Sequence, residues 1–147
     1  MTELVHPQVL VTAARSLINV PWVHQGRSRK GVDCIGLPDL ALRLCGIDFG
    51  QCVGGLPRNY GRTPKQRLFD KVREVLAPAP DLVTGCLLFF QFPEDVLPRH
   101  FGIYTEKETV IHAHGMWKAV KEHGYRGQWV KCTNSRWLLP RIDYGAL

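Results

Sequence analysis

The sequence of 147 residues predicts an α+β domain, with helices in its first half and an antiparallel sheet in its second half. Two observations indicate this order. Apolar residues recur at helical spacing in three segments before residue 77, whereas the segments after residue 85 are short apolar or alternating runs typical of strands. No repeat or low-complexity linker divides the sequence, so residues 1–147 are expected to form a single domain.

The first two predicted helices are amphipathic. The helix predicted at 7–19 begins with a proline, which suits a first helical position, and its apolar stripe is Val9, Leu10, Ala13, Ala14, Leu17 and Ile18. The second follows the sequence GVDCIGL at 31–37, and Gly46 is a natural stop for it. Pro38 predicts a late start or a local kink, because proline cannot donate an intrahelical bond. The buried face of this helix would be Leu37, Leu40, Ala41 and Leu44.

Residues 46–62 are rich in glycine and have no clear period, which predicts an irregular connection. A third helix is predicted to begin at Thr63, with Pro64 at its first position and Gln66 closing a capping box. Two prolines end it, at 78 and 80. Its buried face would be Leu68, Phe69, Val72, Val75 and Leu76.

The second half of the sequence reads as strands. The continuous apolar run at 85–92 suits a buried strand, and 99–105 is predicted to pair with 109–114 through a polar loop. A last pair of short strands is placed around 117–120 and 137–142.

Composition and charge narrow the function classes. No apolar run is long enough to span a membrane, and residues 1–20 lack an apolar signal core, so synthesis in a cytoplasm without a signal peptide is expected. The net charge is +6, but the basic residues are dispersed and no nucleic-acid recognition motif accompanies them. The five cysteines are odd in number and form no CxxC pair, which argues against a disulfide framework and a structural zinc site.

The predicted hairpin at 99–114 gathers histidines on one face. A three-residue loop at 106–108 sets Ile103 opposite Ile111 and Gly102 opposite His112. The apolar face then consists of Phe101, Ile103, Ile111 and Ala113. The other face carries His100, Gly102, Tyr104, His112 and His114, with Gly102 leaving room beside the imidazoles.

Cys34 is expected at a helix N-terminus, where unpaired backbone N–H groups and the helix dipole favour a thiolate. A thiol hydrolase would use one imidazole as base and a second polar group to fix the tautomer of that imidazole, and it needs no cofactor. The alternatives are a zinc site made by His100, His112 and His114, or an edge hairpin with solvated histidines. A cysteine at a helix start favours the thiol hydrolase.

Three motifs resemble the NlpC/P60 cysteine peptidases, which have papain-like α+β folds and cut cell-wall peptides. They are VDCIGL around Cys34, HFGIY from His100 and VIHAH around His112, and they occur in the order typical of the family. The loop PWVHQGRSRKGVDCIGL and the later YGRTP are similar to a branch found in tail-assembly proteins of tailed bacteriophages. The resemblance extends from about residue 8 to residue 121.

The resemblance implies a role for each matching residue. Cys34 would be the nucleophile, His100 the general base and then the general acid, and His112 the orienting third member. The backbone N–H of Cys34 would supply part of the oxyanion hole. The implied reaction is hydrolysis of a peptide bond in the peptidoglycan stem peptide, usually between D-γ-glutamyl and a diamino acid.

Four residues near the nucleophile are expected to bind substrate. Trp22 and Ile35 replace a tyrosine and a serine that shape the pocket in the family. Asp33 is retained and would bind a substrate amine or cap the helix. His24 would line the cleft or lie on the surface.

The leading interpretation is a peptidoglycan endopeptidase of a phage or phage-like tail tip, made in the host cytoplasm and acting on the wall from the virion. Its partners would be stem peptides and tail-tip or hub proteins, with no specific nucleic acid. A catalytically idle module of the tail hub is an alternative, since Trp22 and Ile35 depart from the family pattern. A metallohydrolase and a cytosolic deamidase or transglutaminase-like effector are others. Cys86 is expected to be inert core and His114 a solvated neighbour of the site.

Overall fold

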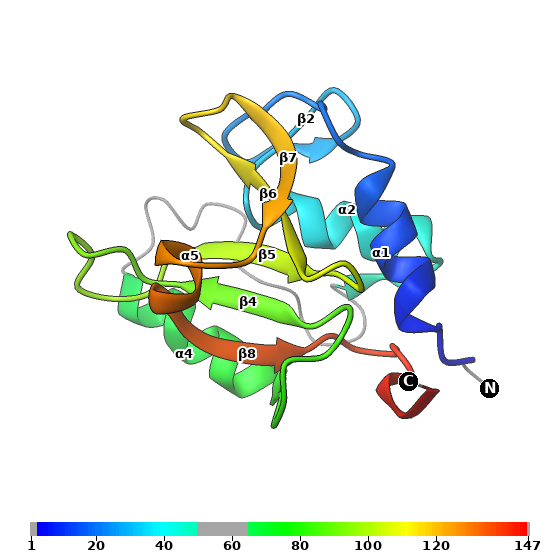
Figure 1. Cartoon of the computed structure of the whole chain (residues 1–147). Helices are drawn as coiled ribbons and strands as arrows, with labels where there is room; N and C mark the ends of the chain where they lie inside the picture. The colour runs from blue at the N-terminus through cyan, green and yellow to red at the C-terminus, as the bar shows by residue number, and fades with distance from the viewer. Residues whose placement is uncertain (1–2, 50–64, 147) are drawn as a thin grey trace.

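The computed structural model describes residues 3–49 and 65–146, in which helices pack on an antiparallel sheet (Figure 1). The strands of the main sheet are β3 Ala77–Pro78, β4 Leu87–Phe90, β5 His100–Tyr104, β6 Thr109–His114, β7 Ala119–Gly124 and β8 Thr133–Leu138. Within the described residues they form one six-stranded sheet in the order β3–β8–β4–β5–β6–β7, with every neighbouring pair antiparallel. The predicted α+β class is confirmed.

Three of the helices in the described residues, at 7–15, 36–44 and 65–75, correspond to predicted ones, and two short helical segments are additional. In chain order they are α1 Pro7–Arg15, α2 Gly36–Leu44, α4 Lys65–Val75, the short α5 Gln128–Lys131 and a 3-10 turn at Tyr144–Ala146. A two-residue hairpin, β1 Arg27–Ser28 and β2 Gly31–Val32, precedes α2. The predicted cap of α4 at Thr63, like most of the predicted connection 46–62, lies outside the described residues.

Helix α1 ends four residues earlier than its apolar pattern predicts. Asn19 has a left-handed backbone, with φ of 76°, and the hydroxyl of Ser16 donates to the carbonyl of Ala13. Leu17 is still fully buried, so the apolar stripe continues through a turn rather than through a helix. Leu10 and Ala14 are buried as predicted, but Val9 is 50% exposed, and Val11, which the predicted stripe leaves out, is fully buried. The periodicity therefore predicted only part of the burial, and it placed the helix end too late.

The main sheet separates two apolar clusters, which decides where the site can form. Side chains alternate along β4, β5 and β6, so that Phe89, Phe101 and Ile111 face α1, α2 and α4. The other face holds Phe90, Tyr104 and Val110 against α5, as Figure 1 shows by the position of α5 across the sheet from α1 and α2. Helices α1, α2 and α4 therefore cover one face of the sheet, and the histidines lie on the other face.

The predicted register of the histidine hairpin is confirmed where the structure pairs it. Ile103 lies opposite Ile111, and Tyr104 lies opposite Val110. Gly102 is needed there: a Cβ atom at this position would meet Val110 Cγ2 at 2.5 Å and His112 Cβ at 3.4 Å. The neighbouring side chains therefore use the space that a larger residue would occupy.

The prediction for the last two strands is wrong in position. Residues 115–118 form a turn in which Lys118 has a φ of 57°, so β7 begins at Ala119 instead of residue 117. Strand β8 ends at Leu138, shortly before Pro140, which has no N–H for a sheet. Helix α5 was not predicted at all, because four residues are too few to show a period.

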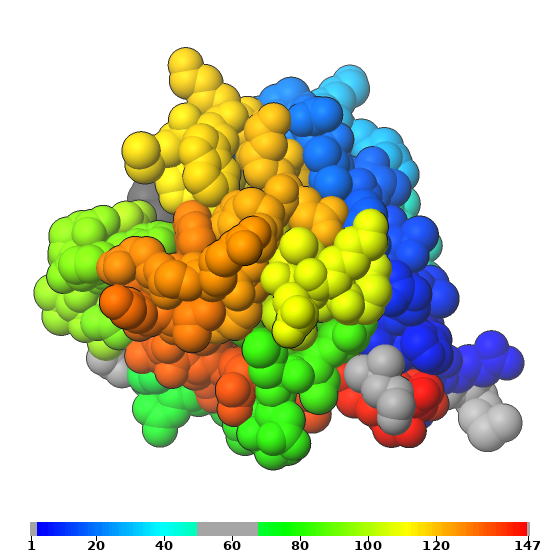
Figure 2. All heavy atoms as spheres, viewed as in Figure 1, coloured from blue at the N-terminus to red at the C-terminus, as the bar shows by residue number. Residues whose placement is uncertain are grey.

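The two ends of the described chain lie side by side (Figure 2). Val5 forms an isolated parallel bridge with Ile142, and its N–H donates to the carbonyl of Arg141 at 2.8 Å. No helix among the described residues is both long and apolar enough to cross a membrane.

Candidate active site

Cys34 lies in the turn between β2 and α2, two residues before the helix begins. Its side chain is buried, and its sulfur lies 3.8 Å from the backbone carbonyl oxygen of Arg99. Arg99 immediately precedes β5, whose first residue is His100. The thiol predicted to be a nucleophile is thus beside the start of the strand that carries the predicted base.

The carboxylate of Asp33 holds this turn in place. Its Oδ1 accepts the backbone N–H of Ile35 at 3.1 Å and of Gly36 at 2.7 Å, and its Oδ2 accepts the N–H of Gln25 at 2.8 Å. Asp33 is fully buried. It therefore satisfies N–H groups at the start of α2 and ties the preceding loop to the same point.

Gly36 allows the loop and the helix to approach closely. A Cβ atom at this position would collide with the backbone carbonyl oxygen of Gly26. Backbone cannot move aside as a flexible side chain would, so the position accepts only glycine without rearrangement. The close approach sets where the turn containing Cys34 lies.

Three imidazoles form a hydrogen-bonded chain on the sheet. His100 Nε2 lies 2.7 Å from His112 Nδ1, and His112 Nε2 lies 2.8 Å from His123 Nε2. His123 Nδ1 lies 2.9 Å from the carbonyl oxygen of Gly124. Lys121 on β7 pairs with His112 on β6, so His123, two residues along β7, lies on the same face. The sheet register brings the three rings together.

Aromatic rings enclose the far end of this chain. The His123 ring centroid lies 4.7 Å from that of Trp129 on α5 and 5.3 Å from that of Trp117 in the β6–β7 turn. The Trp129 centroid is also 4.9 Å from the ring of His112. His112 has no exposed surface and His100 is 8% exposed, so water has little access to these two rings, whereas His123 is half-buried.

Burial keeps the two central imidazoles neutral. It lowers the pKa of His100 to about 3, and electrostatic repulsion of a charged ring by His114 and Arg99 acts in the same direction. Burial also lowers the pKa of His112, with a further contribution from His100. At neutral pH both rings are therefore uncharged, and an uncharged imidazole is the form that accepts a proton in general-base catalysis.

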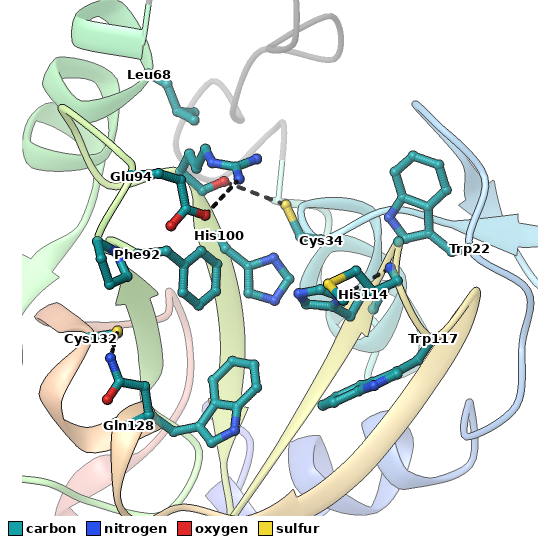
Figure 3. Close-up of a pocket in the computed structure, with 16 residues that line it drawn as sticks. Trp22, Cys34, Leu68, Phe92, Glu94, His100, His114, Trp117, Gln128 and Cys132 are labelled. Carbon is teal, nitrogen blue, oxygen red and sulfur yellow. Dashed lines mark hydrogen bonds and ion pairs between the residues drawn. The ribbon is translucent and has the colours of Figure 1, made fainter.

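Cys34 and His100 open onto one cavity of about 690 Å³. Figure 3 shows Cys34, His100 and His114 near its centre, with Phe92 on one side and the two tryptophans Trp22 and Trp117 on the other. A cavity of this size is in the usual range for small-molecule and peptide sites. The arrangement is a buried thiol and a neutral imidazole at the edge of an aromatic-walled cleft.

A sequence model of the NlpC/P60 family matches residues 19–136. The match includes the turn with Cys34 and all three histidines of the chain described above. This chain belongs to the NlpC/P60 family. No curated protein sequence matches it.

Solved NlpC/P60 structures have the same fold. The NlpC/p60 domain of the peptidoglycan hydrolase SagA matches with a TM-score of 0.61 and 22% identity, covering 92% of this chain and 100% of that one. An NlpC/P60 family protein from Bacillus cereus matches with a TM-score of 0.67 and 18% identity, over 96% of this chain and 41% of that one. The peptidoglycan hydrolase RipB from Mycobacterium tuberculosis matches with a TM-score of 0.59 and 18% identity, covering 94% of this chain and 65% of that one.

Within this NlpC/P60 domain, the predicted site residues separate into two groups. Cys34, His100 and Trp22 line the cavity, and His112 lies directly behind His100. Trp22 is half-buried, and a Cβ atom at Gly115 would lie 3.7 Å from its indole ring. The residues predicted to carry the chemistry are therefore assembled at one place.

The other predicted substrate-binding residues do not line the cavity in the described part of the domain. Asp33 and Ile35 have at most 1% exposed surface, so neither offers a face to a ligand in this conformation. Of the two roles expected for Asp33, the contacts show capping. His24 is exposed, with its ring centroid 6.4 Å from that of Trp22.

Two residues left aside by the site prediction have clear surroundings. Cys86 is fully buried, and burial raises the pKa of its thiol to about 11, in keeping with the inert role expected of it. His114 is half-buried rather than solvated: it lines the cavity, and its Nδ1 accepts the N–H of Met116 at 3.1 Å.

The geometry disfavours the zinc alternative at His100, His112 and His114. Nε2 of His100 and Nδ1 of His112 face each other at hydrogen-bonding distance, so one of them donates to the other and both cannot ligate one ion. Among the described residues, no group of three or more His, Cys, Asp or Glu side chains is arranged to hold a metal.

Neither His123 nor the two tryptophans beside it are among the site residues predicted from the sequence. The predicted strand stopped near residue 120, although Lys121 and His123 continue the alternation that begins at Ala119. Extending that strand would have placed His123 on the histidine face. Trp129 gave no such signal, because its helix is too short to recognise.

Proposed function

We propose that this protein is a cysteine peptidase that hydrolyses a peptide bond in peptidoglycan stem peptides. The observation that carries the proposal is the juxtaposition of Cys34 and His100 at one cavity, with His112 bonded behind His100. Membership of the NlpC/P60 family supports it, and so do the structural neighbours SagA and RipB, both described as peptidoglycan hydrolases.

The proposed reaction uses a thiol, a base and an orienting residue. Nε2 of His100 is engaged by His112, so Nδ1 is the nitrogen that takes the proton from the thiol of Cys34. The sulfur attacks the peptide carbonyl carbon, and the backbone N–H of Cys34 helps to stabilise the oxyanion.

The second half of the reaction returns the proton. His100 protonates the leaving amine as the C–N bond breaks, which leaves a thioester on Cys34. His100 then takes a proton from water, and the hydroxide attacks the thioester. The C–S bond then breaks, His100 returns its proton to the sulfur of Cys34, and the product leaves as a carboxylic acid that ionises in water.

Substitution of the nucleophile tests this chemistry. Cys34→Ala is expected to lower hydrolysis of purified peptidoglycan by about 10⁴-fold or more, because the acyl intermediate can no longer form. Soluble fragments are measured by mass spectrometry. Cys45→Ala is the matched control, since Cys45 lies at the far end of α2 and outside the cavity lining. Activity that survives in Cys34→Ala would rule out the mechanism.

The bond we propose is the one between D-γ-glutamyl and the diamino acid of the stem peptide. This assignment rests on the resemblance of the VDCIGL, HFGIY and VIHAH motifs to the family pattern. Digestion of defined muropeptides tests it, with the product masses expected to place the cut at that bond. A cut at another bond would refute the specificity and leave the thiol chemistry intact.

We further propose that the protein acts at a phage or phage-like tail tip, with tail-tip or hub proteins as partners, after synthesis in the host cytoplasm. The proposal is supported by similarity to tail-assembly proteins in two segments, the loop at 21–37 and YGRTP at 60–64. The second segment lies outside the described residues. Mass spectrometry of purified particles is expected to detect the chain. Presence in particles without hydrolysis of any muropeptide would instead favour an idle hub module.

A further inference from the structure

We propose that His123 is a positioning residue which, through His112, holds His100 in the tautomer whose Nδ1 is free to take the thiol proton. The inference deepens the proposed function and rests on it. The observation behind it is the three-ring chain that runs from the cavity to a backbone carbonyl of β7.

The carbonyl of Gly124, at the end of the row of three imidazoles, decides which ring nitrogens donate and which accept hydrogen bonds. The carbonyl oxygen of Gly124 can only accept, so His123 Nδ1 carries a hydrogen and donates it. In a neutral imidazole the other nitrogen is then an acceptor, so His123 Nε2 accepts from His112 Nε2. By the same rule His112 Nδ1 accepts, and His100 Nε2 donates to it.

The consequence appears at the cavity. With its hydrogen on Nε2, neutral His100 has a lone pair on Nδ1, which is what a base for Cys34 requires. The opposite direction would place a hydrogen on Nδ1 of His100 and remove the acceptor. A backbone carbonyl cannot rotate or exchange donor for acceptor as a side-chain amide can, so Gly124 sets one direction for all three rings.

The packing around His123 supports a fixed orientation. Its ring packs beside Trp117 and Trp129, whose own ring centroids are 5.9 Å apart, and both tryptophans come from elements next to β7. Gly124 is the last residue of β7 and pairs with Thr109 on β6, so its backbone is part of the sheet. The ring and the carbonyl that orients it are therefore held together.

The first test reads the tautomers without any substrate. Long-range ¹H–¹⁵N spectra of the full chain, labelled at histidine, report which ring nitrogen carries hydrogen. We expect hydrogen on Nε2 of His100 and His112 and on Nδ1 of His123 at pH 7. Hydrogen on Nδ1 of His100 in the wild-type protein would overturn the proposal.

The second test removes the acceptor that His123 offers. His123→Phe keeps an aromatic ring against the two tryptophans but leaves His112 Nε2–H without a partner, which favours the reversed tautomer. We expect kcat to fall by about tenfold to a hundredfold, KM to change by less than about twofold, and the His100 hydrogen to shift toward Nδ1.

His123→Gln is the matched variant, because its side-chain oxygen can still accept from His112. We expect kcat within about threefold of wild type and the wild-type tautomer at His100. An equal loss of kcat in both variants with an unchanged His100 tautomer would overturn the proposal in favour of a packing role. If His123→Phe does not fold, as judged by near-ultraviolet circular dichroism, the tautomer of His100 in the wild-type protein and in His123→Gln tests the proposal.

The outcomes separate this inference from the proposed function. A protein that cuts no stem peptide but whose His100 tautomer responds to His123→Phe would refute the function and keep the inference. If the protein cuts stem peptides but the tautomer of His100 is the same in the wild type and in His123→Phe, the proposed function stands and this inference is refuted.

Discussion

At the scale of single residues, the position of the thiol depends on Asp33. Its buried carboxylate accepts three backbone N–H groups, two at the start of α2 and one from the loop at Gln25. A charged acceptor makes stronger bonds than a neutral one, and each N–H left unpaired in a buried turn has a substantial cost. Asp33 therefore acts on the chemistry through the backbone that carries Cys34.

Removing the Asp33 carboxylate tests that dependence. Asp33→Ala is expected to lower the free energy of unfolding by about 3 kcal/mol, because two buried N–H groups and one partly buried N–H group lose their acceptor. Urea denaturation measures the change. Asp39→Ala on the same helix is the control: its carboxylate makes an i,i+4 pair with Arg43 at 3.2 Å, and its loss should cost less than about 1 kcal/mol. Equal losses in the two variants would contradict the capping role.

At the scale of elements, the β5–β6 hairpin assembles the histidines. Its alternation sends Phe101 and Ile111 to the helix-covered core and turns the imidazoles to the opposite face. Gly102 lies in β5 two residues after His100, and Val110 of β6 fills the space above it. The hairpin thus needs a residue without a side chain at its centre.

A methyl group at Gly102 is expected to disturb this packing. In Gly102→Ala the added Cβ would lie 2.5 Å from Val110 Cγ2 and 3.2 Å from the Phe90 ring, so both must shift. We expect a loss of about 1–3 kcal/mol in the free energy of unfolding, measured in urea. Gly115→Ala serves as the comparison, because its Cβ would make only an ordinary contact of 3.7 Å with Trp22. A Gly102→Ala protein as stable as Gly115→Ala would be inconsistent with this account.

At the scale of the whole molecule, charged contacts join the helical part to the sheet. Arg15 at the end of α1 bonds Glu122 on β7 at 2.9 Å and Glu106 in the β5–β6 turn at 2.7 Å. These bonds raise the pKa of Arg15 and lower the pKa of both carboxyl groups. The same folded arrangement buries His100 and His112 as neutral rings, so the fold is linked to pH.

Acid is expected to destabilise the fold. The pKa of His100 is about 3 in the folded chain against an ordinary value of 6.5, so between these values the unfolded chain binds more protons. The contribution of the neutral His100 ring to the free energy of unfolding is complete above the ordinary pKa of 6.5. It is lost as the pH falls toward the pKa of about 3 in the folded chain. From pH 7 to pH 5 the free energy of unfolding should drop by about 2 kcal/mol for each neutral buried histidine.

Urea denaturation at several pH values measures this dependence. His100→Gln removes one titrating ring and should lower the drop between pH 7 and pH 5 by about 2 kcal/mol. A wild-type stability that stays flat over this range would show that the rings are not buried in neutral form.

Much of the fold was predictable because its signals are local. The stripes of α1, α2 and α4, the glycine after α2 and the alternation of β5 and β6 all lie within short stretches of sequence. The bounds of β7 and β8 were not predictable in the same way, since a left-handed turn at Lys118 and the pairing of β8 with β4 decide them. Short α5 became a helix through packing against the sheet.

Local pattern established the α+β class, the order of a cysteine before two histidines, and the face on which those histidines gather, because side-chain period and turn residues are properties of neighbouring positions. Only the folded chain decided that Asp33 caps a turn, that the thiol meets β5, and that His123 extends the chain of rings to a carbonyl. Those facts depend on contacts between segments far apart in sequence, and no local pattern encodes their distances.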